Sequence, residues 1–197
     1  MRENLLADSF IRKALLFSLT LFLLCTAYLN SIYFNHLKEQ VAWRVLTEGG
    51  ILVMSHTHVK GVDDPYRFRM GDCSTQVNLS ETGRKQARRV GQRFRKYGVD
   101  VGIVLHSRWC RTRETATLAF PGITFVDSSF DSFFLRPEHK AFYVKQAKKI
   151  ISNWKSSNAL VLMTHPENIF GITGLNLIPG EALVLKNNSE VVGKIKF

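Results

Sequence analysis

Residues 101–111 read VGIVLHSRWCR, in which a short apolar run is followed at once by histidine, serine, cysteine and two arginines. An apolar run of this length is typical of a buried strand, and the polar residues after it stand at the strand's carboxyl end. Similar runs occur at residues 51–54, 123–126 and 159–163, and the first and last lead into SHTH and THPEN. The sequence thus predicts buried strands that are followed by residues whose side chains can take part in catalysis or ligand binding.

Helical patterns separate these runs at residues 80–97, 111–120 and 138–154. Strands that alternate with helices are typical of an α/β protein, so we expect a three-layer α/β/α sandwich with a mainly parallel sheet. Two further apolar stretches, 182–185 and 191–197, indicate a pair of edge strands joined through Asn187 and Asn188.

In such a sheet the functional groups gather at the carboxyl ends of the strands. The pattern therefore brings His56, Arg111 and His165 to one crevice. Neutral imidazole can attack phosphorus near pH 7, and a guanidinium can hold phosphoryl oxygens in its planar fork. Pro166 suits the first position of a helix, whose free N–H groups would also face an anion.

Four segments in this order carry a family resemblance. They are MSHT at 54–57, NLSETGRKQA at 78–87, SRWCRTRETA at 107–116 and MTH at 163–165. The chain resembles the histidine phosphatase superfamily, which has the phosphoglycerate-mutase-like fold. With GDCSTQ at 71–76, it is most similar to small membrane-anchored bacterial members such as the lipopolysaccharide core heptose-phosphate phosphatase type.

The resemblance implies a phosphatase that works without cofactor or metal. His56 would be the phosphorylated nucleophile, Arg111 a phosphate clamp and His165 the second histidine, which also contacts phosphate. Asp131 is the first candidate for the general acid and Glu114 the second.

One position departs from the family pattern, because Ser55 stands where the family has an arginine before the nucleophile. We keep Ser55 as a phosphate-binding position and expect one of four cations to replace the lost charge: Lys60, Arg69, Arg108 or Arg113. Losing one such donor typically lowers kcat about 10²–10³-fold. The alternative is a catalytically impaired pseudophosphatase that binds phosphorylated ligands.

Two other chemistries are less well supported. His56 and His58 form a His-x-His pair of the kind that zinc hydrolases use, but the spacing provides no third ligand, so we expect no metal. Cys73 and Cys110 both lie in segments predicted to form the site, and either a disulfide or two buried thiols fits the sequence. Cys110 lacks a glycine-rich phosphate loop, which argues against a cysteine nucleophile.

The N-terminal segment is apolar, with no charged residue from position 14 to 35. That length is enough to span a bilayer. We predict an uncleaved signal anchor at 1–36, a connecting helix at 37–49 and a phosphatase domain at 50–197. A cleavable signal peptide and a buried core helix are the alternatives. The basic residues before the span slightly outnumber those after it, which favours the inner membrane with the domain facing the periplasm.

The net charge is +11, and most of it belongs to residues beyond 40. A basic domain attracts anions, so the expected partners are a phosphorylated small molecule or glycan and, through the first helix, the membrane. No nucleic-acid-binding motif accompanies the charge. A basic scaffold tethered at the membrane is the remaining hypothesis, and the oligomeric state is left open.

Overall fold

The computed structural model describes residues 2–62 and 64–197, with side chains described from residue 17 onward. Contacts divide the chain into two compact units, Met1–Lys38 and Glu39–Phe197. Helix α1 (Arg2–Thr47) forms the described part of the first unit and continues into the second. Its segment Phe17–Thr47 is long and apolar enough to be a membrane anchor. The domain boundaries at residues 36 and 49 stay predictions.

The second unit is built on one six-stranded sheet. Its order is β3 (Thr124–Val126), β2 (Val101–His106), β4 (Ala159–Thr164), β1 (Ile51–Ser55), β5 (Glu181–Leu185) and β6 (Val191–Lys196). The first four strands are parallel, whereas β5 and β6 are antiparallel. The predicted α/β fold with a mainly parallel sheet is confirmed.

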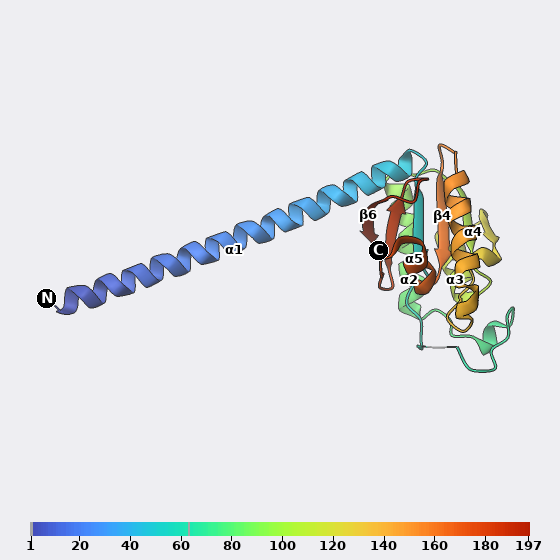
Figure 1. Cartoon of the computed structure of the whole chain (residues 1–197), viewed down its shortest axis with the longest axis horizontal. Coiled ribbons are helices and arrows are strands. Elements are labelled where there is room, and N and C mark those ends of the chain that lie inside the picture. Colours follow the sequence, from blue (N-terminus) through green and yellow to red (C-terminus); the bar gives the residue numbers. More distant parts are fainter. Residues whose placement is uncertain (1, 63) are drawn as a thin grey trace. The chain divides into compact units, whose positions relative to one another are not determined.

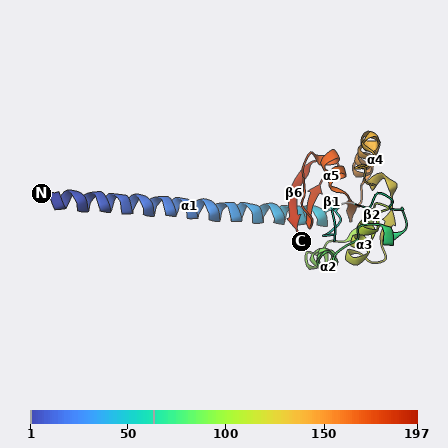
Figure 2. The ribbon, with the colours of Figure 1, turned by 90° about the horizontal axis from the view of Figure 1, so that it is seen from below.

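Helices cover both faces of this sheet. They are α2 (Glu81–Lys96), α3 (Cys110–Ala119), α4 (Lys140–Asn153) and α5 (Pro166–Thr173). Figures 1 and 2 show the strands between two helical layers, with α2 and α3 on one side and α4 and α5 on the other. Short 3-10 turns lie at Cys73–Thr75, Ser128–Phe130 and Pro137–His139.

Strand β1 shows why the core has two halves. Successive side chains of a strand point to opposite faces. Leu52 and Met54 belong to the cluster packed under α2, α3 and the last turns of α1, whereas Ile51 and Val53 belong to the cluster under α4 and α5. All four are fully buried, as an uninterrupted apolar run in a parallel sheet requires.

Helix α2 has clear start and stop signals. The Ser80 hydroxyl caps it by accepting a hydrogen bond of 3.0 Å from the Gly83 amide. Glu81 lies in the first turn, and three basic residues lie in the last, where each complements the helix dipole. Ala87, Val90 and Phe94 face the core, as their spacing predicts.

The last turns of α1 are part of the second unit. The Trp43 ring is buried and stacks on Tyr97 with a centroid distance of 4.3 Å. The Arg93 guanidinium lies over the same two rings and pairs with Glu39. This cation–π and aromatic packing fixes the end of α1 against the last turns of α2.

Gly91 tests the packing of α2 on α3. Alanine is normally the better helix former by about 1 kcal/mol. Here a Cβ at position 91 would lie 2.1 Å from the Ala119 carbonyl oxygen, so the helices would have to move apart. We expect Gly91→Ala to lower the free energy of unfolding by about 1–3 kcal/mol in urea denaturation. The exposed neighbour change Gln92→Ala should have little effect, and equal stabilities would contradict this packing.

Candidate active site

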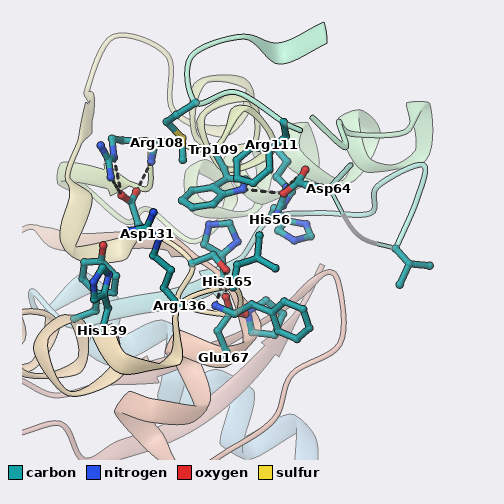
Figure 3. A pocket seen from close by; sticks show the side chains of 18 of the residues that line it. His56, Asp64, Arg108, Trp109, Arg111, Asp131, Arg136, His139, His165 and Glu167 are labelled. Atoms are coloured by element: carbon teal, nitrogen blue, oxygen red, sulfur yellow. Dashed lines mark hydrogen bonds and ion pairs between the residues drawn. The ribbon is translucent and has the colours of Figure 1, made fainter. Parts of the chain in front are cut away.

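Three parallel strands bring the predicted residues together. Ser55 of β1 lies opposite Thr164 of β4, and His106 of β2 lies opposite Met163 of β4. The residues that follow these strands therefore emerge at one edge of the sheet. Figure 3 shows His56, Arg111 and His165 around this edge.

They line one cavity of about 1420 Å³. Its wall consists of residues from four parts of the chain: His56, Val62, Asp64, Tyr66, Phe68, Met70, Arg108, Trp109, Arg111, Asp131, Ser132, Phe134, Leu135, Arg136, His139, Tyr143, His165, Pro166, Glu167, Phe170 and Asn176. With a volume of about 1420 Å³, the cavity is much larger than a phosphoryl group requires.

The His56 ring is fixed by a hydrogen bond at its own backbone. Its Nδ1 lies 2.9 Å from the Thr57 carbonyl oxygen. A carbonyl only accepts hydrogen bonds, so Nδ1 carries the proton of the neutral ring. The Nε2 lone pair is then left for attack on an electrophile, which is the state a nucleophilic histidine needs.

His165 is held by a chain of hydroxyl groups. Its Nε2 lies 2.8 Å from the Ser107 Oγ, which lies 2.6 Å from the Thr112 Oγ1. The Thr112 hydroxyl donates to the Trp109 carbonyl oxygen at 2.8 Å. Ser107 accordingly donates to Thr112 and accepts from the His165 Nε2–H. The centroids of the His165 and His56 rings lie 5.9 Å apart.

Both histidines are held in the neutral form. Burial lowers the pKa of His56 to about 4, and the nearby Arg111 charge acts in the same direction. Burial also brings the pKa of His165 well below its ordinary value, helped by the charges of Arg111 and His56. A free nucleophile and an uncharged second histidine are thus present throughout the physiological pH range.

Arg111 is paired with a carboxylate that the sequence analysis missed. Its Nη1 lies 2.9 and 2.8 Å from the two carboxylate oxygens of Asp64. Asp64 also accepts from the Trp109 Nε1 at 2.9 Å and from the Val77 amide at 2.8 Å. Burial by itself would raise the pKa of Asp64, but the hydrogen bonds from Arg111, Val77 and Trp109 hold it below its ordinary value.

Asp131 lies in the cavity wall with its carboxylate already engaged. It is 1% exposed and accepts from the Arg108 amide at 2.9 Å and from the Arg108 Nε at 2.6 Å. The Arg108 Nη2 lies 2.5 Å from the same carboxylate. Arg108 therefore occupies both oxygens of the Asp131 carboxylate in the cavity wall.

Of the other two acids, Glu114 lies outside the cavity and Glu167 lines it. Glu114 pairs with Arg84 at 2.6 Å and borders a separate hollow beside Cys73. Glu167, in the first turn of α5, lines the cavity and accepts a hydrogen bond from the Ser132 hydroxyl. Glu167 was visible in the THPEN segment, but no pattern there favoured it over the other acids.

Ser55 is buried, with its hydroxyl 3.2 Å from the His56 carbonyl oxygen, and it is not among the cavity-lining residues. Of the four cations expected to replace the family arginine, Arg108 alone lines the cavity, and it is paired with Asp131. Arg136 was missed; it lines the cavity, and no ion pair of its side chain is found within residues 2–62 and 64–197.

Cys73 and Cys110 form a disulfide, which resolves the alternative that the sequence left open. It ties the loop before α2 to the first residue of α3, next to Arg111. Among the described residues, no group of three histidine, cysteine or acidic side chains could hold a metal ion.

The lowered pKa of His56 gives a stability prediction. An unfolded histidine binds a proton below pH 6.5, whereas folded His56 does so only below about 4. The unfolded state therefore binds more protons between these values, and stability falls as the pH falls. The free energy of unfolding can be followed by tryptophan fluorescence in urea. Between pH 6.5 and 4 it should fall by about 1–3 kcal/mol more in wild type than in His56→Asn. Parallel pH profiles would contradict the burial of a neutral ring.

The pairing of Asp64 with Arg111 gives a binding prediction. Asp64→Asn removes a negative charge from the place where an anion would approach Arg111. We expect inorganic phosphate to bind about tenfold tighter by titration calorimetry, and stability to fall by about 1–3 kcal/mol. Asp72→Asn, which removes an exposed partner of Arg69, is the matched control and should leave phosphate binding as in wild type. Weaker phosphate binding in Asp64→Asn would instead make Asp64 a support for Arg111.

Comparisons with known proteins give a family match for part of the chain and similar solved folds. Residues 68–126 match the family model of the histidine phosphatase superfamily (branch 1). No curated protein matches the sequence. The structure of Rv3214 from Mycobacterium tuberculosis superposes with a TM-score of 0.53 at 16% identity, covering 69% of this chain and 90% of that one.

Two other solved structures are similar. The protein histidine phosphatase SixA, complexed with tungstate, gives a TM-score of 0.52 at 11% identity and covers 75% and 96% of the two chains. TTHB049 from Thermus thermophilus gives 0.52 at 16% identity, with coverage of 75% and 99%. The resemblance to the lipopolysaccharide heptose-phosphate type stays a prediction. The matched segment runs from the loop before α2 to the end of β3, and the solved structures share the fold of this domain.

Proposed function

We propose that this chain is a phosphomonoesterase that forms a phosphohistidine on His56. The observation that carries the proposal is the free Nε2 of a neutral His56 in one cavity with Arg111 and His165. A neutral nucleophile, a planar cation and a buried second imidazole are the groups that phosphoryl transfer uses.

In the first step the His56 Nε2 lone pair forms a bond to phosphorus while the ester P–O bond breaks. The leaving oxygen takes a proton from a carboxylic acid or water, and besides Asp64, which pairs with Arg111, the described wall holds the carboxyl groups of Asp131 and Glu167. Arg111 stabilises charge on the phosphoryl oxygens. In the second step water attacks phosphorus and the P–N bond breaks. His56 is regenerated, inorganic phosphate is released, and the proton lost by the attacking water restores the acid that protonated the leaving oxygen.

The second imidazole changes its role when a phosphoryl group is bound. Since the His165 Nε2–H is donated to Ser107, only a protonated Nδ1 could donate to a phosphoryl oxygen. A bound dianion favours that protonation, because it opposes the positive charge of Arg111 that lowers the pKa of His165 in the free site.

The proposed setting is the inner membrane, with α1 as a single-pass anchor and the domain in the periplasm. The apolar segment of α1 supports the anchor, and the Cys73–Cys110 disulfide supports an oxidising compartment. The proposed substrate is a phosphorylated small molecule or glycan, which the basic charge of the domain would attract.

A second candidate function is phosphate-ester binding without turnover. Two observations favour it: Ser55 supplies no cation, and Asp64 compensates the charge of Arg111. A site with so little net positive charge stabilises the transition state less.

The first test is hydrolysis of 4-nitrophenyl phosphate by the full chain in lipid nanodiscs, with EDTA present. We expect turnover that resists chelation and kcat/KM at least about 10³-fold lower in His56→Asn. Brief reaction with substrate labelled at phosphorus should leave acid-labile label on wild type alone. Full activity in His56→Asn would reject the proposal.

The same series separates the two candidate functions. Phosphate binding that is lost in Arg111→Met, with no labelled protein in wild type, would establish the binding module instead. Turnover gained by Ser55→Arg would then show that the missing arginine had silenced the site.

A further inference from the structure

The wall of the cavity combines polar and apolar side chains. Six apolar members of the wall are each at least 38% exposed: Val62, Tyr66, Met70, Phe134, Leu135 and Phe170. We call this set the apolar rim. It is contributed by three segments, namely the loop after β1, the turn after Ser128–Phe130, and α5.

The apolar rim is unusually exposed for its composition. Val62 is 94% exposed and Tyr66 99%, while Phe134 and Leu135 are each 66% exposed. Scattered exposed apolar residues need no explanation, but a group of them around one opening marks a binding surface. Because these side chains line the same cavity as His56, whatever they bind lies next to the reacting phosphoryl group.

The geometry of the reaction indicates which part of the substrate would contact the apolar rim. An ester whose phosphorus lies at the His56 Nε2 has to place its alcohol in the remaining cavity. A volume of about 1420 Å³ exceeds that of ordinary ligand pockets, which measure about 300–1,000 Å³. The alcohol therefore has room to reach the apolar rim, and apolar groups on it would be removed from water there.

We infer that the substrates are amphiphilic phosphate monoesters, in which the phosphate is carried by an alcohol with an apolar or aromatic body. This inference rests on the proposed phosphatase function and adds the class of its substrate. The part of the alcohol next to the phosphate meets polar groups, since the cavity that His165 lines is also lined by Arg136 and His139. The candidate membrane span of the same chain agrees with a substrate that partitions into lipid.

The test compares two phosphonates, whose P–C bond the site cannot hydrolyse, so binding is measured apart from turnover. The full chain in lipid nanodiscs is titrated calorimetrically with methylphosphonate and with hexylphosphonate, and empty nanodiscs correct for partitioning. We expect hexylphosphonate to bind at least about tenfold tighter, because its chain is long enough to bury two or more methylene groups on the rim.

A matched pair of double variants locates the effect. Phe134→Thr with Leu135→Thr removes two adjacent rim side chains, each 66% exposed. Phe125→Thr with Val126→Thr removes two adjacent apolar side chains, 55% and 60% exposed, outside the cavity lining. The affinity ratio of hexylphosphonate to methylphosphonate should fall toward one in the rim variant and stay at the wild-type value in the control.

Equal affinities for the two phosphonates in wild type would overturn the inference. The same ratio in both double variants would overturn it as well. In either case the protein could still hydrolyse 4-nitrophenyl phosphate. Failure of the inferred substrate class can therefore be told apart from failure of the proposed phosphatase function. If neither phosphonate binds and no ester is hydrolysed, the proposed function fails and the inference with it.

Discussion

The site depends on the parallel pairing of β4 with β1 on one side and with β2 on the other. This pairing places Ser55 beside Thr164 and His106 beside Met163, so the next residues of all three strands emerge in one row. A shift of one residue in either pair would turn every side chain of that strand to the opposite face. The two apolar halves of the core forbid such a shift, because it would exchange residues between them. Core packing thus sets the positions of the reactive groups.

The resting site is close to electrically balanced. Asp64 compensates Arg111 and Asp131 compensates Arg108, while both histidines are neutral. Such compensation keeps buried charges stable in a cavity without an anion, because an unpaired buried charge is costly. It also means that an arriving dianion must compete with carboxylates that are part of the fold. The balance between a stable empty site and a tightly bound phosphate is therefore set by the loop that holds Asp64.

The sequence predicted the strand-end histidines and Arg111, because hydrophobic runs mark where strands end and neighbouring parallel strands end together. It did not predict the partners of these residues. Asp64 reaches Arg111 through an irregular loop, and no periodicity describes the path of such a loop. Asp131 was found from its place after a strand, but its pairing with Arg108 depends on tertiary contacts. The burial of Ser55 follows from the strand register, which sequence patterns alone do not give.

The disulfide has a consequence for the unfolded chain. Cys73 and Cys110 are separated by 37 positions, and their bond closes a covalent ring that contains α2 and β2. In the chain-entropy view, closing a ring of this size removes about 4 kcal/mol of conformational freedom from the denatured ensemble. Arg111 directly follows the ring and Asp64 stands nine positions before it, so the disulfide shortens the chain path between these two residues. An oxidised unfolded chain thus explores fewer separations of the two charges than a reduced one.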